Sequence, residues 1–268
     1  MGYPLLSKAY KKAFPFRLGT TSYIYPAPIL PNVERLGPFL DEIELVLYES
    51  RGDDNLPAQT EIDRLKELSI EMGVTFNVHL PIDIFLGDPS RAVRSEGIEV
   101  VKKFIERTRP LFPSTYTLHF SLRNRQDQDA PDPDRWRADL AKSSEEILRL
   151  GIEPSSVSIE TLGYPYEWIE DIVGAARFSI CLDIGHILIS KRDLNDAFDR
   201  YLDRTSIIHL HGFQDGVDHL GIDRMSENVL GQIFSRLRDY KGVLSLEVFS
   251  FEDLSRSLPL LEERWKRG

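Results

Sequence analysis

The stretch SVSIETLGYPYEWIEDIVGAARFSICLDIGH, residues 156–186, contains the repeating unit that decides the fold. Two short apolar runs, 156–161 and 178–184, lie on either side of a segment with a helical pattern. Runs this short and this rich in β-branched residues are typical of strands. Each run also ends near a carboxylate, Glu160 or Asp183, which a buried apolar strand does not need. The stretch predicts a strand–helix–strand unit with polar side chains at its strand ends.

The same unit recurs along the chain. Six further apolar runs have the length and composition of strands, at 17–22, 42–49, 74–80, 115–120, 206–212 and 243–249. Amphipathic segments with helical spacing lie between the runs, at 60–73, 90–112, 133–151, 195–204, 226–240 and 251–265. Eight strands alternating with helices predict an α/β protein, a single-domain (β/α)8 TIM barrel at 17–268 after an N-terminal leader at 1–16. A doubly wound open sheet is the alternative, but no dinucleotide fingerprint or Walker loop supports it.

Composition limits the class of protein. The 268 residues fit one α/β barrel, and 41% of them are hydrophobic, enough for a large core. A single cysteine, Cys181, and the lack of a secretory apolar region predict a cytoplasmic protein without disulfides. No apolar run approaches the roughly 20 residues of a membrane span. The net charge of −10 disfavours nucleic acid as a partner, because sequence-independent binding rests on lysine and arginine.

Carboxylates and imidazoles gather at the C-terminal ends of the predicted strands. They are Glu49, His79, His119, Glu160, Asp183, His186, His209, His211 and Glu247, with His219 in the loop after the seventh strand. In a TIM barrel these ends converge on the catalytic face. For any one histidine a hydrogen-bonded core role is the simpler interpretation, but a ligand at one strand end after another favours a metal site. Mixed nitrogen and oxygen ligands suit Zn²⁺, Mn²⁺ or Fe²⁺ better than Mg²⁺ or Ca²⁺.

The motifs NVHLP, TLHF, SIET, CLDIGH, IIHLHG and LSLEVF resemble the xylose isomerase-like TIM-barrel superfamily, which includes the endonuclease IV type of AP endonuclease (AP endonuclease family 2). The resemblance runs from Arg17 onward. It implies a first divalent ion held by His79, His119 and Glu160. It implies a second ion held by Glu160, Asp183, His209 and Glu247.

A third ion would use His186 and His219, with Asp218 as its candidate partner. Asp218 and His219 are adjacent, whereas the endonuclease branch separates the corresponding pair by one residue. This chain also has His211 where that branch has an amide. The expected cofactors are therefore two or three divalent ions, Zn²⁺ or Mn²⁺/Fe²⁺, and His211 and His219 are alternatively substrate or proton-transfer residues.

Finer motifs, LGTTSYIYP, ELVLYES, NVHLP and HLHG followed by DHL, resemble the cobamide-remodelling phosphodiesterases. That resemblance implies hydrolysis of the nucleotide-loop phosphodiester of cobalamin-like corrinoids to a cobinamide-type product. The expected partner is therefore a small-molecule cobamide, and the sequence leaves the oligomeric state open.

Roles follow from the chemistry of a phosphodiester. Two ions that share one carboxylate ligand would neutralise the negative charge of the phosphodiester, and Glu160 is the predicted shared ligand. The predicted catalytic residues are Glu160, Glu247, His211 and Glu49, with His211, His186 or Glu49 as proton relay. The predicted substrate contacts are Arg123 and Arg125 for phosphate, and Tyr23, Tyr25 and Tyr164 for stacking on a corrin or base. Solvated loops and packing at the barrel rim are the alternatives for these five residues.

Other functions compete with phosphodiester hydrolysis. A metal-dependent sugar isomerase or epimerase would hold one ion with Glu160, Asp183, His209 and Glu247. His79 and His119 discriminate between the two, because they would be ion ligands in a phosphodiesterase but only substrate contacts in an isomerase. An AP-endonuclease-like DNA phosphodiesterase is a third candidate. A non-enzymatic corrinoid- or metal-binding module is the fourth.

Overall fold

The fold is a closed barrel of eight parallel strands. The computed structural model describes residues 3–51, 55–122 and 132–267. Around the barrel the strand order is β1-β10-β7-β6-β5-β4-β3-β2. The barrel strands are β1 Arg17–Thr21, β2 Glu42–Val46, β3 Thr75–His79, β4 Tyr116–Leu118, β5 Val157–Glu160, β6 Ser179–Asp183, β7 Thr205–Leu210 and β10 Val243–Leu246. All eight predicted strands are confirmed, each somewhat shorter than its apolar run, and the single-domain TIM barrel is confirmed with them.

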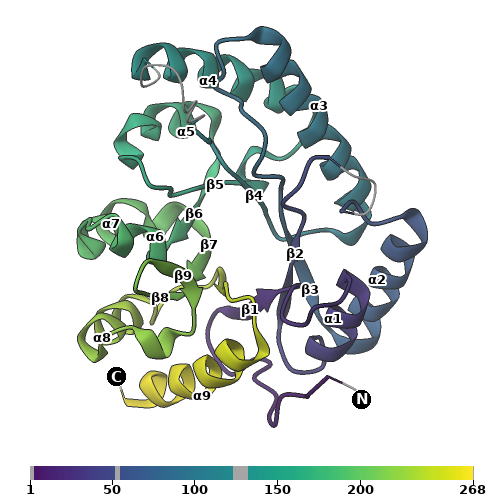
Figure 1. Ribbon diagram of the computed structural model, residues 1–268, viewed down its shortest axis with the longest axis vertical. Helices are drawn as coiled ribbons and strands as arrows, with labels where there is room; N and C mark the ends of the chain where they lie inside the picture. Colours follow the sequence, from purple (N-terminus) through teal and green to yellow (C-terminus); the bar gives the residue numbers. More distant parts are fainter. Residues whose placement is uncertain (1–2, 52–54, 123–131, 268) are drawn as a thin grey trace.

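Helices surround the strands as an outer ring (Figure 1). They are α1 Ile29–Leu36, α2 Gln59–Met72, α3 Arg91–Thr108, α4 Pro133–Leu148, α5 Glu170–Ala176, α6 Ile184–Ile189, α7 Leu194–Tyr201, α8 Glu227–Arg236 and α9 Phe251–Arg267. Short 3-10 helices are η1 Arg109–Leu111, η2 Pro154–Ser156, η3 Tyr166–Trp168, η4 Leu202–Arg204 and η5 Ile222–Arg224. The six predicted helical segments correspond to α2, α3, α4, α7, α8 and α9. None of the helices in the described ranges is both long and apolar enough to cross a membrane.

The segment after β7, expected to be a loop, is an antiparallel hairpin of β8 Gly212–Gln214 and β9 Val217–Leu220. Its two turn residues, Asp215 and Gly216, have φ values of 54° and 80°. Positive φ at both central residues is the geometry that an Asp-Gly pair favours in tight hairpins. The hairpin folds the chain back so that the rings of His211 and His219 stack with centroids 4.2 Å apart.

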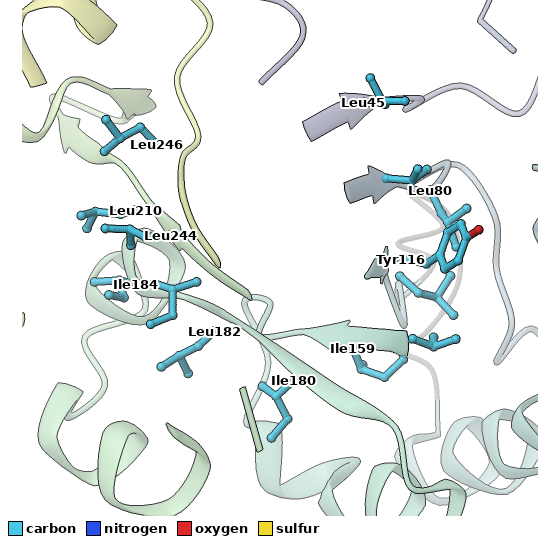
Figure 2. Close-up of a cluster of buried hydrophobic side chains, with 14 of the residues drawn as sticks. Leu45, Leu80, Tyr116, Ile159, Ile180, Leu182, Ile184, Leu210, Leu244 and Leu246 are labelled. Carbon is cyan, nitrogen blue, oxygen red and sulfur yellow. The ribbon is translucent and has the colours of Figure 1, made fainter. Parts of the chain in front are cut away.

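The two faces of the barrel strands differ in polarity. The outward face carries the aliphatic side chains that pack under the helices, among them Ile159, Leu182 and Leu244 in Figure 2. The inward face is largely polar. Ser245 on β10 donates a hydrogen bond of 2.6 Å to Glu44 on β2, although β1 lies between these two strands. Such a contact can only cross the barrel interior. Each strand is therefore buried on both faces, but only its outer face is apolar.

Residues 3–16, the described part of the predicted leader, pack against the barrel. Tyr10 is buried, and its backbone N–H donates to the carbonyl of Phe39 at 2.7 Å. The Lys11 ammonium donates to the carbonyl of Met72 at the end of α2. Phe16 packs edge-on against Trp265 of α9. This segment thus contacts α2, α9 and the loop before β2.

Candidate metal centre

Ionisable side chains collect inside the barrel at the carboxyl ends of its strands. Six are at most 2% exposed, and they are His79, Glu160, Asp183, His209, His211 and Glu247. Three more histidines line the opening with 15–22% of their side chains exposed, and they are His119, His186 and His219. In the described part of the chain, no lysine or arginine forms an ion pair with any of them. A buried set of charges with no such partner is suited to a bound cation.

The first group is built around one oxygen of Glu160. His79 Nε2 lies 3.2 Å from Glu160 Oε2, and His119 Nε2 lies 2.9 Å from the same oxygen. His79 Nδ1 is 3.0 Å from the carbonyl of Leu80, which can accept the Nδ1 proton and leave the Nε2 lone pair free. The structure therefore brings together the three residues predicted for a first ion.

The second group surrounds Nδ1 of His209. Carboxylate oxygens of Glu247, Glu160 and Asp183 lie 3.1, 3.8 and 3.9 Å from this nitrogen. His209 Nδ1, Asp183 Oδ2 and Glu247 Oε2 are all buried, and none of these atoms has a hydrogen-bond partner. Buried polar atoms are almost always paired, so three unpaired donors and acceptors in one place fit a divalent ion. Three of the residues predicted for a second ion therefore surround a nitrogen of the fourth, although the close set of four ligand residues at His209 consists of Glu44, His79, His209 and Glu247.

The third group joins Asp183 to three histidines. His186 Nδ1 lies 3.5 Å from Asp183 Oδ2, and His211 Nε2 lies 3.3 Å from Asp183 Oδ1. His219 completes the group. Asp218, the candidate partner from sequence, is half exposed and contacts only the far nitrogen of His219, Nδ1, at 3.0 Å. If a third ion binds, this geometry favours His211 over Asp218 as its ligand.

The DIGH motif explains how Asp183 and His211 meet. Asp183 ends β6 and also caps α6, because its Oδ1 accepts the backbone N–H of His186 at 2.6 Å. A Cβ on Gly185 would lie 2.1 Å from the His211 ring, so only glycine leaves room for that ring. The backbone N–H of His219 and the carbonyl of Gly212 lie 3.0 and 3.1 Å from His211 Nδ1, so the hairpin holds this side of the ring while Nε2 faces Asp183.

In this cluster the attraction between carboxylates and imidazoles shifts the pKa values of Glu160, His186 and His219 more than burial does. Burial alone would raise the pKa of Glu160, but the surrounding histidines, His119 foremost, hold that pKa well below its usual range. Burial alone would lower the pKa of His186, but Asp183 and Glu160 raise it to about 10. In the same way Glu247 and Asp218 raise the pKa of His219 to about 9. An ion entering the cluster must therefore displace protons from imidazoles.

Two residues of the centre, Glu44 and Tyr48, do not stand out when only strand ends are considered. Glu44 lies in the middle of β2, with Oε1 3.1 Å from His209 Nε2. The Tyr48 hydroxyl donates to Glu247 Oε1 at 2.8 Å, and burial followed by the charge of Glu247 raises the Tyr48 pKa well above its usual value. The alternation of acids in EIELV, which puts Glu42 and Glu44 on one face of the strand, was the available signal.

Several predicted site residues lie elsewhere. Glu49 is exposed, and no contact joins its side chain to the cluster, so the predicted relay role is not supported by its position. Tyr25 is buried, with its hydroxyl donating to the carbonyl of Pro4, and Tyr164 packs between Trp136 and Trp168. Neither ring is free to stack on a substrate.

Tyr23 is 55% exposed, beside Phe249 at the barrel mouth, and it alone of the three tyrosines remains available for stacking. Arg123 and Arg125 lie outside the described residues.

Comparisons with known proteins agree with this architecture. Residues 31–266 match the family described as a xylose isomerase-like TIM barrel. The L-ribulose 3-epimerase of Mesorhizobium japonicum is 24% identical over 266 residues, covering 93% of this chain and 87% of the relative.

Solved structures give the same fold. A D-tagatose 3-epimerase-like protein matches with a TM-score of 0.77 and 19% identity, covering 94% of this chain and 98% of that one. Endonuclease IV from Thermus thermophilus matches with a TM-score of 0.69 and 16% identity, covering 94% of this chain and 100% of that one. The IolI protein, solved with a zinc atom, matches at 0.66 and 15%, covering 94% and 96%. At these identities the structural matches establish the fold alone.

Proposed function

This chain belongs to the xylose isomerase-like TIM-barrel family, and from that premise we propose that it is a metal-dependent phosphodiester hydrolase. One observation carries the proposal. Glu160 Oε2 lies within hydrogen-bond distance of Nε2 of both His79 and His119, and it also lies 3.8 Å from Nδ1 of His209. One carboxylate thus stands between two sets of ligands, which is the arrangement that a bridged pair of ions requires.

The residues of the chain fit the needs of that reaction. Bound divalent ions would supply Lewis acidity and neutralise the phosphodiester anion. The carboxylates Glu160, Asp183 and Glu247 would hold them, each fixed by a histidine or a hydrogen bond. Tyr48 orients Glu247 through its hydroxyl, which stays protonated because its pKa is raised well above the usual value.

We propose that a residue at the barrel mouth donates the proton that the leaving oxygen needs. When water attacks phosphorus and the P–O bond breaks, the departing oxygen needs a proton. His219 is partly exposed at the barrel mouth, with Nε2 3.5 Å from Glu247, and it is the imidazole that we propose as the donor of that proton. His211 is fully buried, with Nε2 3.3 Å from Asp183, so it is not placed to relay protons to substrate.

The substrate we propose is the nucleotide-loop phosphodiester of a cobamide. Support comes from the motifs that resemble the cobamide-remodelling phosphodiesterases, and from the net charge of −10, which disfavours DNA as a substrate. The exposed ring of Tyr23 beside Phe249 offers a stacking surface for a planar group next to the metal centre.

Sugar epimerisation is the second candidate, and the comparisons favour it. The curated relative and several of the similar structures carry the names of sugar 3-epimerases. The group around His209 Nδ1 could hold one ion for such a reaction, with Glu160 and Glu247 as two carboxylates able to move protons. In that case His79 and His119 would contact substrate and bind no ion.

One experiment separates the two candidates. Metal-loaded protein is incubated in parallel with adenosylcobalamin or pseudocobalamin and with L-ribulose or D-tagatose, and the products are identified by mass and by sugar chromatography. Our proposal predicts release of the lower-ligand nucleotide and no epimer. Epimer formation without nucleotide release would refute it. His119→Asn is the matched variant, because it should abolish hydrolysis while retaining the ligands around His209.

A further inference from the structure

Glu44 is a buried carboxylate with few polar neighbours. It lies in the middle of β2, fully buried, on the strand face that points into the barrel. Its Oε2 accepts the hydroxyl of Ser245 at 2.6 Å. Its Oε1 lies 3.1 Å from Nε2 of His209, which is ion-pair distance without hydrogen-bond geometry, and neither atom has a hydrogen-bond partner. In the described part of the chain, no lysine or arginine pairs with Glu44.

Glu42 shows how this barrel accommodates a carboxylate that has only a structural role. It lies on the same face of the same strand, two residues earlier, and is also fully buried. Arg17 Nε lies 3.1 Å from its Oε2, and Thr75, Asn77 and Ser114 donate hydrogen bonds to its two oxygens. Its charge is therefore compensated within the fold. Glu44 lacks a comparable set of donors, and His209 is the ionisable side chain that its free oxygen contacts.

The position of Glu44 decides which nitrogen of His209 can bind an ion. Nδ1 faces the carboxylates of Glu160, Asp183 and Glu247, while Nε2 faces Glu44. A neutral imidazole carries one proton, and a carboxylate beside Nε2 holds that proton there, leaving the Nδ1 lone pair free. We propose that Glu44 is a positioning residue of the metal centre, which fixes the tautomer and ring orientation of His209.

This inference rests on the metal centre and not on the reaction. It applies whether the enzyme cleaves phosphodiesters or epimerises sugars. Glu44 is fully buried and lies on the Nε2 side of His209, close to His79 and Glu247 as well. Its effect should therefore appear in metal binding measured without any substrate.

The test compares Glu44→Ala and Glu44→Gln with the matched control Glu42→Gln. Metal-stripped proteins are titrated with Co²⁺, whose visible absorption reports the ligands, and dissociation constants come from competition with a chelator. We expect Glu44→Ala to weaken binding at the His209 group by about 10- to 100-fold and to change the Co²⁺ spectrum. Glu44→Gln keeps an oxygen that can accept the Nε2 proton, so it should recover much of the affinity and the spectrum. Glu42→Gln should leave both unchanged.

Two results would overturn the proposal. One is wild-type affinity and spectrum in Glu44→Ala. The other is an equal loss in Glu42→Gln, which would mark a general effect of removing a buried charge. If Glu44→Ala does not fold, Glu44→Leu takes its place, because leucine fills a similar volume without an acceptor oxygen. Weakened binding and an altered spectrum in Glu44→Leu, with both retained in Glu44→Gln, support the positioning role, and wild-type affinity and spectrum in Glu44→Leu refute it.

Discussion

The raised pKa of His219 predicts how the stability of the metal-free protein changes with pH. The Glu247 carboxylate lies 3.5 Å from His219 Nε2, and the Asp218 carboxylate lies 3.0 Å from Nδ1. Burial alone would lower the pKa of this ring, but the two carboxylates raise it to about 9. When the pKa of a group is higher in the folded protein than in the unfolded chain, its proton stabilises the fold. This stabilisation is complete at pH values below the unfolded-state pKa, and it is lost as the pH rises through the folded-state pKa.

The size of the effect follows from the two pKa values. With an unfolded value of about 6.5, the proton on His219 contributes about 2 kcal/mol to the free energy of unfolding at about pH 7.5 and less than about 1 kcal/mol at about pH 9. Wild type should therefore lose about 1–2 kcal/mol more than His219→Gln between these two values of pH. Subtracting the result for the variant from that for wild type removes the contributions of other groups that titrate in the same pH range.

The assay is urea unfolding of chelator-stripped protein, wild type and His219→Gln, across this pH range. Addition of Zn²⁺ or Mn²⁺ should reverse the trend, because an ion at the cluster displaces the imidazole protons and binds more tightly as pH rises. Parallel stability profiles for the two metal-free proteins would refute the assignment of a raised pKa to His219.

Two further substitutions test the geometry of the centre. Tyr48→Phe removes the 2.8 Å hydrogen bond to Glu247. Because hydrogen bonds to charged groups contribute about 1.5–3 kcal/mol, metal affinity measured by calorimetry should fall about tenfold or more. An unchanged affinity would contradict the orienting role of Tyr48. Gly185→Ala places a Cβ 2.1 Å from the His211 ring and should lower the melting temperature and disturb the third ligand group. Gly231→Ala is its control, because that Cβ meets open space and should cost no stability; an equal loss in both would exclude the steric explanation.

The sequence predicts the barrel well because its strand and helix periods are regular. The aliphatic residues that make the runs visible, such as Ile159 and Leu182, are those of the outer face, which packs under the helices. The polar interior was harder to foresee. Glu44 and Ser245 contact each other across the barrel, and they belong to strands that are far apart in sequence. Alternation identifies a face, but only the closed strand order brings these two side chains together.

Ligand residues at strand ends were predictable for a related reason. His79, Glu160 and His209 lie at or near the ends of parallel strands, and the barrel carries all such ends to one mouth. Residues in irregular segments were not placed as well. Tyr25 and Tyr164 follow strands as Tyr23 does, yet local packing buries the first two and leaves the third exposed. The choice of His211 over Asp218 depended on the hairpin of β8 and β9, which was expected to be a loop.

The number of ions that the centre holds is the most direct test of a hydrolase with Glu160 as a shared ligand. Metal-to-protein ratios are measured by elemental analysis after equilibration with Zn²⁺ or Mn²⁺ and removal of free metal. We predict at least two ions per chain in wild type, and one fewer in His119→Asn, since His119 belongs to the first group alone. A single ion per chain, unchanged by His119→Asn, would contradict the shared-ligand centre and leave the one-ion epimerase as the better account.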